Sequence, residues 1–598
     1  MPDKPFRNKS YLCALALSLS SAFAATPSPV NSYLVHNLVS DLPSMADYED
    51  PNLVNPWGLA TTASSPFWIG NNGSGTSTLY GTTGAPIALV VTIPTPTAST
   101  GGAVSGVIAN TTTSFTVATG KPASFIFCTE DGTVSGWSSS VNSGVPVITV
   151  NNSASNSVFK GCAIGGTSAA PVLYVTDFHN GVVDMFDANY KPITAAANAF
   201  TDSAIPAGFA PFNIMSFGGM MYVTYAKQDA AKHDDVAGAG NGFVDIFDGS
   251  GNLVTHLISQ GPLNSPWGMQ MAPATFGQFS GALLVGNFGD GTINAFDPAK
   301  GTQLGTLQDP TGHPLTILGL WGLLFGNGGR GGDTSTLYFT AGTPGPYGEP
   351  AESHGLFGSI QPPPAFTTAV NGASFQAPLA PNTWASIIGG GLATTSRSWA
   401  STDFSGANLP TTIDGVSVTV NGAAAAVDYV GPSQIDFLIP ANATAGSAQI
   451  QVNNNDQISA AATVTLLPAA PAFFWLTGNK YIVATHANGT LAGPTTLITG
   501  ETTPVAPGET IVLYGTGFGA TATAPPNNAT FPAPLSLATL PTITIGGAPA
   551  TVAYAGLIEP GVFQINVVAP TSLPAGDAAV VATVGGQQSQ ANAFLSVL

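Results

Sequence analysis

The amino-acid sequence predicts an all-β protein, a six-bladed β-propeller followed by two Ig-like β-sandwich domains. Two internal repeats and the composition carry this prediction. The 598 residues include 71 Gly and 48 Pro, and only 7% of them are charged. Turns are therefore frequent, and the charged surface typical of helices is scarce. A chain of this length is expected to hold several domains.

The N-terminus predicts export. Three basic residues precede the apolar run 11–20, and Ala22-Phe-Ala24 has the form of a signal-peptidase site. The run is too short to cross a bilayer, so residues 1–24 are interpreted as a signal peptide, with an uncleaved anchor as the alternative. We expect a secreted protein, extracellular or at the cell surface, with the periplasm as another destination. No other segment is apolar enough to span a membrane.

The charge of the chain excludes some partners. It has 12 Lys+Arg against 31 Asp+Glu, a net charge of -19. Nucleic acids and anionic membrane surfaces both require basic residues, so neither is an expected partner. The hydrophobic fraction of 44% provides enough apolar surface to exclude intrinsic disorder.

A repeated three-strand unit predicts the propeller over residues 31–361. Each unit opens with an apolar inner strand and continues through a second strand, a Gly/Asn/Asp turn and a third strand. Six units of about 45–55 residues fit the blade period of propellers. The units are seen at Asn55–Asn72, Ser124–Trp137, Lys160–Asp187, Pro211–Asp248, Ser265–Pro298 and Leu320–Gly358. The sixth lacks a fourth strand, and Tyr33–Val39 is expected to supply it and close the ring.

A different repeat follows Pro362-Pro-Pro364 and predicts two sandwich modules, 366–467 and 472–598. Their strands alternate apolar residues with Thr, Ser or Asn, as in sheets with one buried face. Three segments recur at similar spacing in both modules. The matching pairs are Trp384–Leu392 with Thr510–Phe518, Val416–Ala423 with Thr542–Ala548, and Gln434–Pro440 with Gln564–Pro570.

Two cysteines, Cys128 and Cys162, remain after the signal peptide. They lie in strand-like runs that the repeat places in neighbouring blades. In an oxidising compartment such a pair predicts a disulfide. Two buried free thiols are the alternative.

The longest departure from the repeat is the loop 226–242, which concentrates charge in a nearly uncharged chain. Long loops on a rigid β scaffold often carry binding groups. We therefore consider it a ligand or cation site at the propeller mouth, with Asp229, Asp234 and Asp235 as metal ligands. Oxygen-rich sites of this kind suit Ca²⁺. A solvated loop that stabilises its own turn is the alternative. The candidate ligand-binding residues of this loop are Lys227, Asp229, His233, Asp234 and Asp235.

A second set of candidates recurs in the turns of the blades. Such Asx residues are most simply explained by side-chain hydrogen bonds to the backbone. Propeller symmetry would also allow a polar ring around the channel. Trp57, Trp267 and Trp321 are expected to pack between blades rather than to bind a sugar. The turn candidates are Asp131, Asp177, His179 and Asp290, with Asn71 and Asn287 at equivalent positions.

Residues 31–360 resemble a secreted bacterial six-bladed propeller family of uncharacterised function. The resemblance rests on Asn-Pro-Trp-Gly at 55–58, Thr-Glu-Asp-Gly-Thr at 129–133, Ala-Pro-Phe-Asn-Ile at 210–214, and the motifs at 222–229 and 286–291. Residues 366–598 resemble the Solibacter-type C-terminal module, related to Ig-like IPT/TIG domains. Such modules serve as spacers and adhesion domains, so the resemblance implies a location more than an activity.

Enzyme signatures are scarce. The sequence contains no Gly-x-Ser-x-Gly elbow, no His-Glu-x-x-His and no P-loop. The first hypothesis is a non-enzymatic secreted protein whose propeller binds an extracellular glycan, protein or small molecule and whose Ig-like modules form a stalk or attachment. The second is a Ca²⁺-dependent hydrolase or lactonase with its site at the channel mouth, an analogy at the level of fold.

Overall fold

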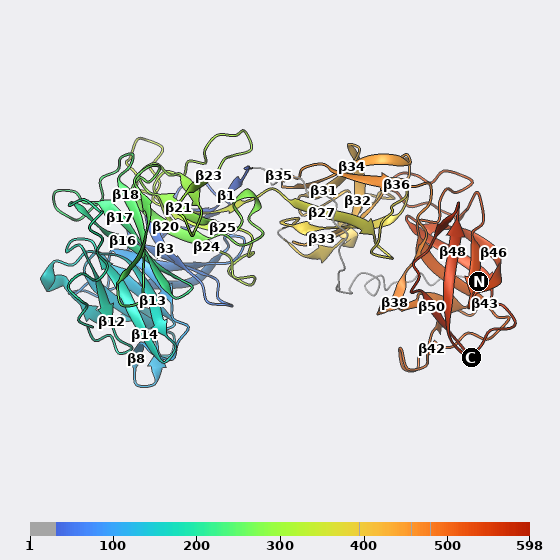
Figure 1. Cartoon of the computed structure of the whole chain (residues 1–598), viewed down its shortest axis with the longest axis horizontal. Helices are drawn as coiled ribbons and strands as arrows, with labels where there is room; N and C mark the ends of the chain where they lie inside the picture. The colour runs from blue at the N-terminus through green and yellow to red at the C-terminus, as the bar shows by residue number, and fades with distance from the viewer. Residues whose placement is uncertain (1–30, 394, 456, 479) are drawn as a thin grey trace. The chain divides into compact units, whose positions relative to one another are not determined.

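The structure is a computed structural model that describes residues 31–598, with positions 394, 456 and 479 excepted. The signal peptide predicted over 1–24 lies outside the described residues. The chain divides into two compact units at Pro362 and Pro363. Both units are built from β-strands and very short 3-10 helices, as Figure 1 shows. The all-β prediction is therefore confirmed.

The first unit is a six-bladed propeller. Each blade is a sheet that runs outward from an inner strand, antiparallel throughout except for the parallel pair β1–β2 at the edge of blade 6. Blade 1 contains β3 (Pro56–Ala60), β4 (Phe67–Asn71), β5 (Thr76–Tyr80) and β6 (Pro86–Thr92). Blade 2 contains β7 (Val104–Ala109), β10 (Phe125–Thr129), β11 (Thr133–Ser138) and β12 (Asn142–Asn151). Blade 3 contains β13 (Phe159–Thr167), β14 (Ala170–Asp177) and β15 (Val182–Phe186), preceded by η2 (Ser153–Ser155).

The remaining blades follow the same order. Blade 4 contains β16 (Phe209–Phe217), β17 (Met220–Lys227), β18 (Gly242–Phe247) and β19 (Leu253–Ser259). Blade 5 contains β20 (Pro266–Met271), η3 (Gly277–Phe279), β21 (Leu283–Asn287), β22 (Ile293–Phe296) and β23 (Gln303–Thr306). Blade 6 contains β24 (Leu320–Phe325), β25 (Leu337–Ala341) and β26 (Leu356–Gln361), and is completed by β1 (Leu34–Ser40) and β2 (Tyr48–Glu49).

The N-terminal strand closes the ring. β1 pairs antiparallel with β26, from Leu34 opposite Gln361 to Ser40 opposite Leu356. The sequence predicts this pairing, with bounds that differ by one residue. Closure covers the edge that blade 6 would otherwise expose.

Blade 2 begins earlier than the sequence predicts. The run at Ser124, taken as its inner strand, is the second strand β10, and the inner strand is β7. A small hairpin of β8 (Thr116–Ala118) and β9 (Lys121–Pro122) is inserted between them. β7 was missed because Val104-Ser-Gly-Val-Ile-Ala lies between Gly-, Ser- and Thr-rich segments and resembles a loop.

The Trp-Gly dipeptides explain how neighbouring inner strands pack. A Cβ at Gly268 would lie 2.4 Å from the Trp321 carbonyl oxygen, and one at Gly322 would lie 2.6 Å from that of Trp57. Both separations are below van der Waals contact, so only glycine allows these backbones to approach. The repeated motif in blades 1, 5 and 6 therefore marks close contact between inner strands.

The second unit contains two hydrophobic cores, one within 366–466 and one within 473–597. The first module is built from β27 (Ala365–Asn371), β28 (Trp384–Gly390), β29 (Arg397–Ser398), η4 (Ser401–Asp403), β30 (Thr412–Ile413), β31 (Val416–Val420), β32 (Ala423–Val430), β33 (Gln434–Leu438), β34 (Gly446–Asn454), β35 (Gln457–Ile458) and β36 (Ala462–Leu466).

The second module is built from β37 (Ala472–Phe473), β38 (Trp475–Thr477), β39 (Tyr481–Ile482), β40 (Ala484–His486), β41 (Leu491–Ala492), β42 (Thr502–Thr503), β43 (Thr510–Thr516), β44 (Leu535–Ser536), β45 (Thr542–Ile545), β46 (Ala548–Glu559), β47 (Val562–Val568), β48 (Gly576–Val584), β49 (Gln587–Gln588) and β50 (Phe594–Val597). The repeated segments occupy equivalent places, because β28 pairs with β33 as β43 pairs with β47.

Candidate functional site

Aromatic side chains from five blades fill the centre of the propeller. We call this group the aromatic plug; it consists of Trp57, Phe178, Phe212, Trp267, Phe288 and Trp321. The indoles of Trp57 and Trp321 stack with centroids 3.5 Å apart, and the Trp267 ring meets both edge-on. The three tryptophans pack between blades, as predicted from the sequence.

Polar groups anchor the plug at its rim. Asn55 Oδ1 accepts hydrogen bonds from the Nε1–H groups of Trp57 (3.1 Å) and Trp321 (3.2 Å). Trp267 Nε1–H donates to the Lys160 carbonyl at 3.2 Å. All three buried indole donors are therefore satisfied, which fixes the rings in place.

A buried lysine lies against the plug. The Lys160 side chain, on the inner strand β13, is only 1% exposed. Its ammonium pairs with Glu130 and with Asp234, the latter at 3.2 Å. It also lies 5.0 Å from the centroid of a Trp57 ring, a cation–π distance. Burial lowers the pKa of Lys160, but the two carboxylates outweigh burial and raise it, so the ammonium stays charged.

Four residues from three blades form what we call the ionic cluster: Glu130, Lys160, His233 and Asp234. His233 Nδ1 lies 2.9 Å from Asp234 Oδ1. Asp234 is 67% exposed; burial of its inner part raises its pKa, but Lys160 and His233 outweigh this and lower it. Asn72 donates to Glu130 Oε2 at 2.8 Å. The cluster thus has a buried inner half and a carboxylate–imidazole pair that faces solvent.

Glu352 adds a third carboxyl group beside the cluster. It lies between β25 and β26, and its Oε1 accepts a hydrogen bond from Asn55 at 3.1 Å. Burial raises its pKa to about 7, and the negative charges of Glu130 and Asp234 act in the same direction. Glu352 is therefore a group that changes charge near neutral pH.

The three predicted metal ligands, Asp229, Asp234 and Asp235, do not converge on one point. Asp229 Oδ1 accepts the backbone N–H groups of His233 and Asp234 and so shapes the loop. Asp235 is largely buried near Ser265, and burial raises its pKa. Only Asp234 joins the ionic cluster. Lys227 is exposed at the end of β17.

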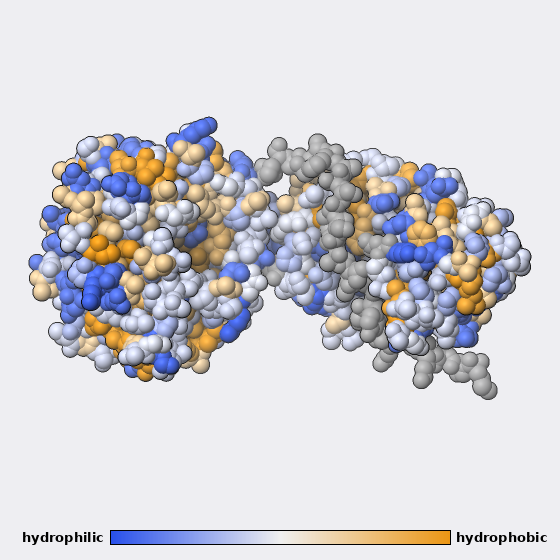
Figure 2. Space-filling view, turned by 60° about the horizontal axis from the view of Figure 1, so that its bottom comes forward, coloured by the Kyte–Doolittle hydropathy of each residue, from blue (hydrophilic) through white to orange (hydrophobic). Residues whose placement is uncertain are grey.

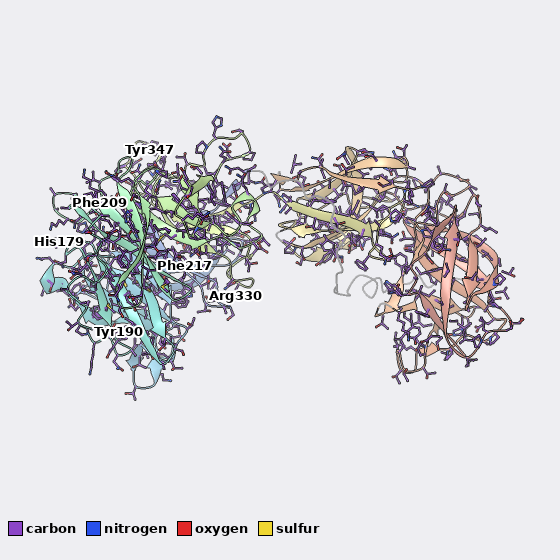
Figure 3. The ribbon with its side chains drawn as sticks, viewed as in Figure 1. His179, Tyr190, Phe209, Phe217, Arg330 and Tyr347 are labelled. Atoms are coloured by element: carbon purple, nitrogen blue, oxygen red, sulfur yellow. The ribbon has the colours of Figure 1, made fainter. Side chains whose placement is uncertain are left out.

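The turn candidates make local hydrogen bonds. Asp131 Oδ2 accepts the Ala103 N–H at 2.8 Å, and burial raises its pKa. Asp177 accepts the backbone N–H groups of Val158 and Asn180. Asp290 accepts the N–H and hydroxyl of Thr292. His179 follows β14 and is labelled in Figure 3. These contacts support the turn interpretation rather than a polar ring.

The sequence did not single out Lys160, Glu130, Glu352 or Asn55. Lys160 carried one usable signal: in a chain with only 12 Lys+Arg, a lysine stands within an apolar inner strand. A buried lysine requires a partner, so its position implies nearby carboxylates. For Glu352 the sequence offers no signal of this kind. It lies in a loop 222 residues after Glu130 (352 − 130), so nothing local indicates that the two carboxyl groups are close.

The predicted disulfide is absent: Cys128 and Cys162 are both buried and free. They share one hydrophobic cluster between blades 2 and 3. Burial raises the pKa of the Cys128 thiol, and a hydrogen bond with Cys162 contributes in the same direction. The alternative of two thiols acting as small apolar residues matches the structure.

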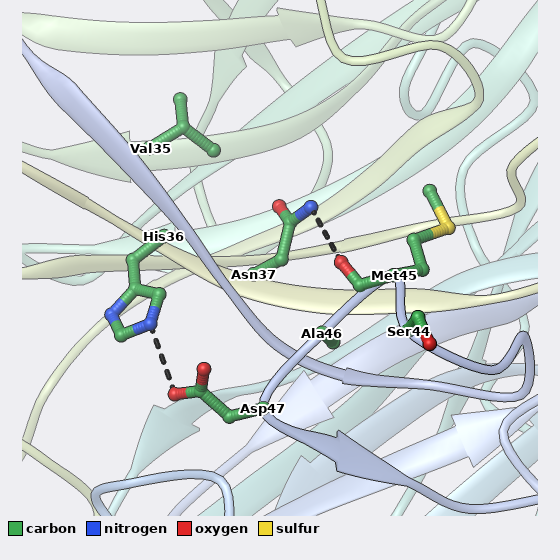
Figure 4. A pocket seen from close by; sticks show the side chains of 7 residues that line it. All are labelled: Val35, His36, Asn37, Ser44, Met45, Ala46 and Asp47. Atoms are coloured by element: carbon green, nitrogen blue, oxygen red, sulfur yellow. Dashed lines mark hydrogen bonds and ion pairs between the residues drawn. The ribbon is translucent and has the colours of Figure 1, made fainter.

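A shallow, open pocket of about 590 Å³ lies beside β1 at the outside of blade 6, as Figure 4 shows. In it, His36 Nε2 lies 2.9 Å from Asp47 Oδ2 and Asn37 donates to the Met45 carbonyl at 3.1 Å. Both members of the His36–Asp47 pair are about half exposed. Exposed pairs of this kind contribute little, so the pocket is a weaker candidate than the channel mouth.

Two surface features complete the description. On the propeller face visible in Figure 2, apolar residues form small patches between polar ones. Within 31–598, the described part of the chain, no helix has the length and hydropathy needed to cross a membrane.

Comparison with known structures gives weak likenesses for the propeller half. A streptogramin B lyase superposes with a TM-score of 0.34 and 10% identity, covering 55% of this chain and 98% of that one. The PQQ-bound aldose sugar dehydrogenase of Streptomyces coelicolor gives 0.31 and 11%, covering 56% and 100%. These values are too low to carry fold or function over to this chain.

Comparison with known sequences is more specific. Residues 401–466 match the IPT/TIG domain. "Uncharacterized protein R648" of Acanthamoeba polyphaga mimivirus is 34% identical over 302 residues, 49% of this chain and 74% of its own length. "Uncharacterized protein L690" of the same virus is 32% identical over 324 residues, 52% of this chain and 83% of its own. The chain therefore belongs to the family of these mimivirus proteins, and it carries an IPT/TIG domain in its C-terminal half.

Proposed function

We propose that the protein is an exported, non-enzymatic binding protein whose propeller recognises a ligand at the channel mouth. In this proposal the Ig-like modules form a stalk or attachment. The observation that carries it is the ionic cluster on the aromatic plug. The plug closes the channel beneath the cluster, and Asp234 and His233 remain open to solvent.

The charges of the cluster favour a ligand with a cationic or hydrogen-bond-donating group. Lys160 contributes one positive charge, and Glu130 and Asp234 contribute two negative ones. The net charge of the chain, -19, acts in the same direction. Suitable ligands are a basic segment of an extracellular protein, an amino sugar or a small cationic molecule.

The alternative, a Ca²⁺-dependent hydrolase, is weaker at this site. An ion held by Glu130, His233 and Asp234 would have to compete with the Lys160 ammonium, which already contacts both carboxylates. A buried ammonium so close to a divalent cation would be strongly repelled.

The proposal is tested with the exported chain, purified from residue 25, on arrays of glycans and basic peptides. The best ligand is then measured by biolayer interferometry against Asp234→Asn and His233→Ala. Both variants should weaken binding at least about fivefold, whereas Asp309→Asn, in an exposed turn of the same propeller, should not. Ca²⁺-dependent turnover of lactones that Asp234→Asn abolishes would favour the alternative. N-terminal sequencing of the secreted protein tests export.

A further inference from the structure

A second cluster of ionisable groups lies away from the channel, on the outer strands of blade 4. Asp245 is on the third strand, β18, and His256 is opposite it on the outermost strand, β19. Asp202 comes from the segment that links β15 of blade 3 to β16 of blade 4. The three side chains therefore join a long connection to the edge of the next blade.

Both carboxylates contact the same ring nitrogen. His256 Nδ1 lies 2.6 Å from Asp202 Oδ2 and 2.8 Å from Asp245 Oδ1. The Asp202 side chain is 5% exposed and that of Asp245 is 0% exposed. One N–H can donate well to only one of these two oxygens.

The fully buried side chain of Asp245 also has an unmet oxygen. Asp245 Oδ2 is buried and has no hydrogen-bond partner. Asp202 Oδ2 is likewise buried without a hydrogen-bond partner, whereas Asp202 Oδ1 accepts the Ala204 N–H at 2.8 Å. A buried carboxylate oxygen without a partner is uncommon and requires a neutralising group.

The charges do not balance. Even with His256 protonated, two carboxylates face one positive charge. Among the described residues, no ion pair joins Lys or Arg to either carboxylate. The nearby Tyr225 hydroxyl donates to the Phe200 carbonyl and supplies no charge. Negative charge in a dry site is relieved either by a bound cation or by protonation of Asp245, whose pKa burial raises to about 7.

The other ring nitrogen of His256 has the partner that a metal-binding imidazole requires. His256 Nε2 hydrogen-bonds with Ser259 Oγ on the same strand. Metal-binding histidines usually donate their second N–H to such an oxygen, which fixes the ring. With Nε2 as the donor, Nδ1 carries the lone pair and lies within 3 Å of an oxygen of each carboxylate. His256 is 29% exposed, which gives an ion a path from solvent.

We propose that Asp202, Asp245 and His256 bind a divalent transition-metal ion of the Zn²⁺ class. One imidazole nitrogen and two carboxylate oxygens suit Zn²⁺ better than Ca²⁺ or Mg²⁺, which prefer oxygen ligands alone. Ligand atoms around tetrahedral Zn²⁺ are separated by about 3.3 Å. The two contacts to Nδ1, at 2.6 and 2.8 Å, therefore have to lengthen by about 0.5–0.7 Å. The ion would fasten the connection from blade 3 to the outer edge of blade 4.

The site is independent of the channel mouth, so it is tested separately. Tag-free exported chain is stripped with a chelator, dialysed and titrated with ZnCl₂ by isothermal calorimetry. We expect one equivalent to bind and the melting temperature to rise. Asp245→Asn and His256→Gln should each weaken binding at least about 100-fold and remove the thermal shift.

Controls separate this site from other histidines and from misfolding. Two control variants should still bind one Zn²⁺ per chain. They are His36→Gln, in an exposed His–Asp pair, and Asp234→Asn, in the ionic cluster. His256 is partly exposed, so His256→Gln should keep the wild-type circular dichroism spectrum. The proposal is overturned if the wild-type chain binds no Zn²⁺ at micromolar concentration, or if Asp245→Asn and His256→Gln still bind it. Labelling of Ser259 by a fluorophosphonate would also overturn it, because Ser259, His256 and Asp245 would then act as an acyl-transfer triad.

Discussion

The indoles of Trp57 and Trp321 donate to the same oxygen, Asn55 Oδ1, while their rings stack at 3.5 Å. One amide thus orients aromatic side chains from blades 1 and 6, on either side of the point where the ring closes. Two of the three indoles in the aromatic plug therefore share one acceptor, and replacing Asn55 tests how much that acceptor stabilises the plug.

Asn55→Gly should destabilise the propeller by about 2–4 kcal/mol, because two buried indole N–H groups lose their acceptor. Glycine is the suitable replacement because Asn55 has a φ of 48°, which glycine adopts without strain. Urea unfolding followed by tryptophan fluorescence measures the loss. Asn156→Gly is the control: its φ is 53° and its side chain is exposed, so the change should stay within about 0.5 kcal/mol. Equal effects of the two substitutions would show that the shared acceptor contributes nothing.

Lys160→Met should destabilise the propeller at pH 7 by about 3–5 kcal/mol, because the buried Glu130 carboxylate loses its counter-charge. Adding Glu130→Gln to the same chain should recover much of the loss. Lys227→Met, at an exposed position, serves as the matched control and should have little effect. If the double variant is no more stable than Lys160→Met, the ion pair is not the cause. Urea melts of all four chains make the comparison.

Glu352→Gln should make the protein more stable at pH 8 but not at pH 4. The folded-state pKa of Glu352 is about 7 against an ordinary value of 4.5. The folded chain therefore binds the proton more tightly, and stability declines as pH rises from about 4.5 to about 7. Glutamine removes this decline, a gain of about 2 kcal/mol at pH 8 once solvent screening is allowed for.

The measurement for Glu352 is a set of thermal melts between pH 4 and pH 8. Glu49→Gln provides the control, because Glu49 is exposed on β2 and its replacement should leave the pH profile unchanged. Parallel profiles for wild type and Glu352→Gln would refute the raised pKa.

The two cysteines should titrate as free thiols. Without reductant, the chain purified from residue 25 should show no reaction with Ellman's reagent when folded, because both thiols are buried. It should show two reactive thiols in guanidinium chloride. Cys128→Ala, which leaves one thiol, calibrates the count. No reactive thiol in the denatured wild type would show that Cys128 and Cys162 form a disulfide.

Much of the fold could be predicted because its signals are local. The Pro-Trp-Gly runs mark inner strands whose glycines allow close contact, and the missing fourth strand of blade 6 pointed to the N-terminus. Blade 2 was misplaced because β7 has a loop-like composition, so its role comes from pairing with β10.

The sites were predicted less well because they depend on distant residues. The loop 226–242 stands out in the sequence by its charge, but of its residues only His233 and Asp234 join the ionic cluster, since Asp229 shapes the loop. Their partners Glu130 and Lys160 come from other blades. The Asp202–Asp245–His256 group depends on strand register within blade 4, which the sequence does not reveal.

Ring closure by β1 and β26 also affects the order in which the chain can fold. The strand at 34–40 is synthesised first, but its partner at 356–361 is synthesised more than 300 residues later. Until blade 6 emerges from the ribosome, the chain therefore holds at most five complete blades and an unpaired leading strand. Completion of the ring can occur only once the last blade has emerged, so the closed propeller forms only after residue 361 has been synthesised and truncated propellers keep an open edge.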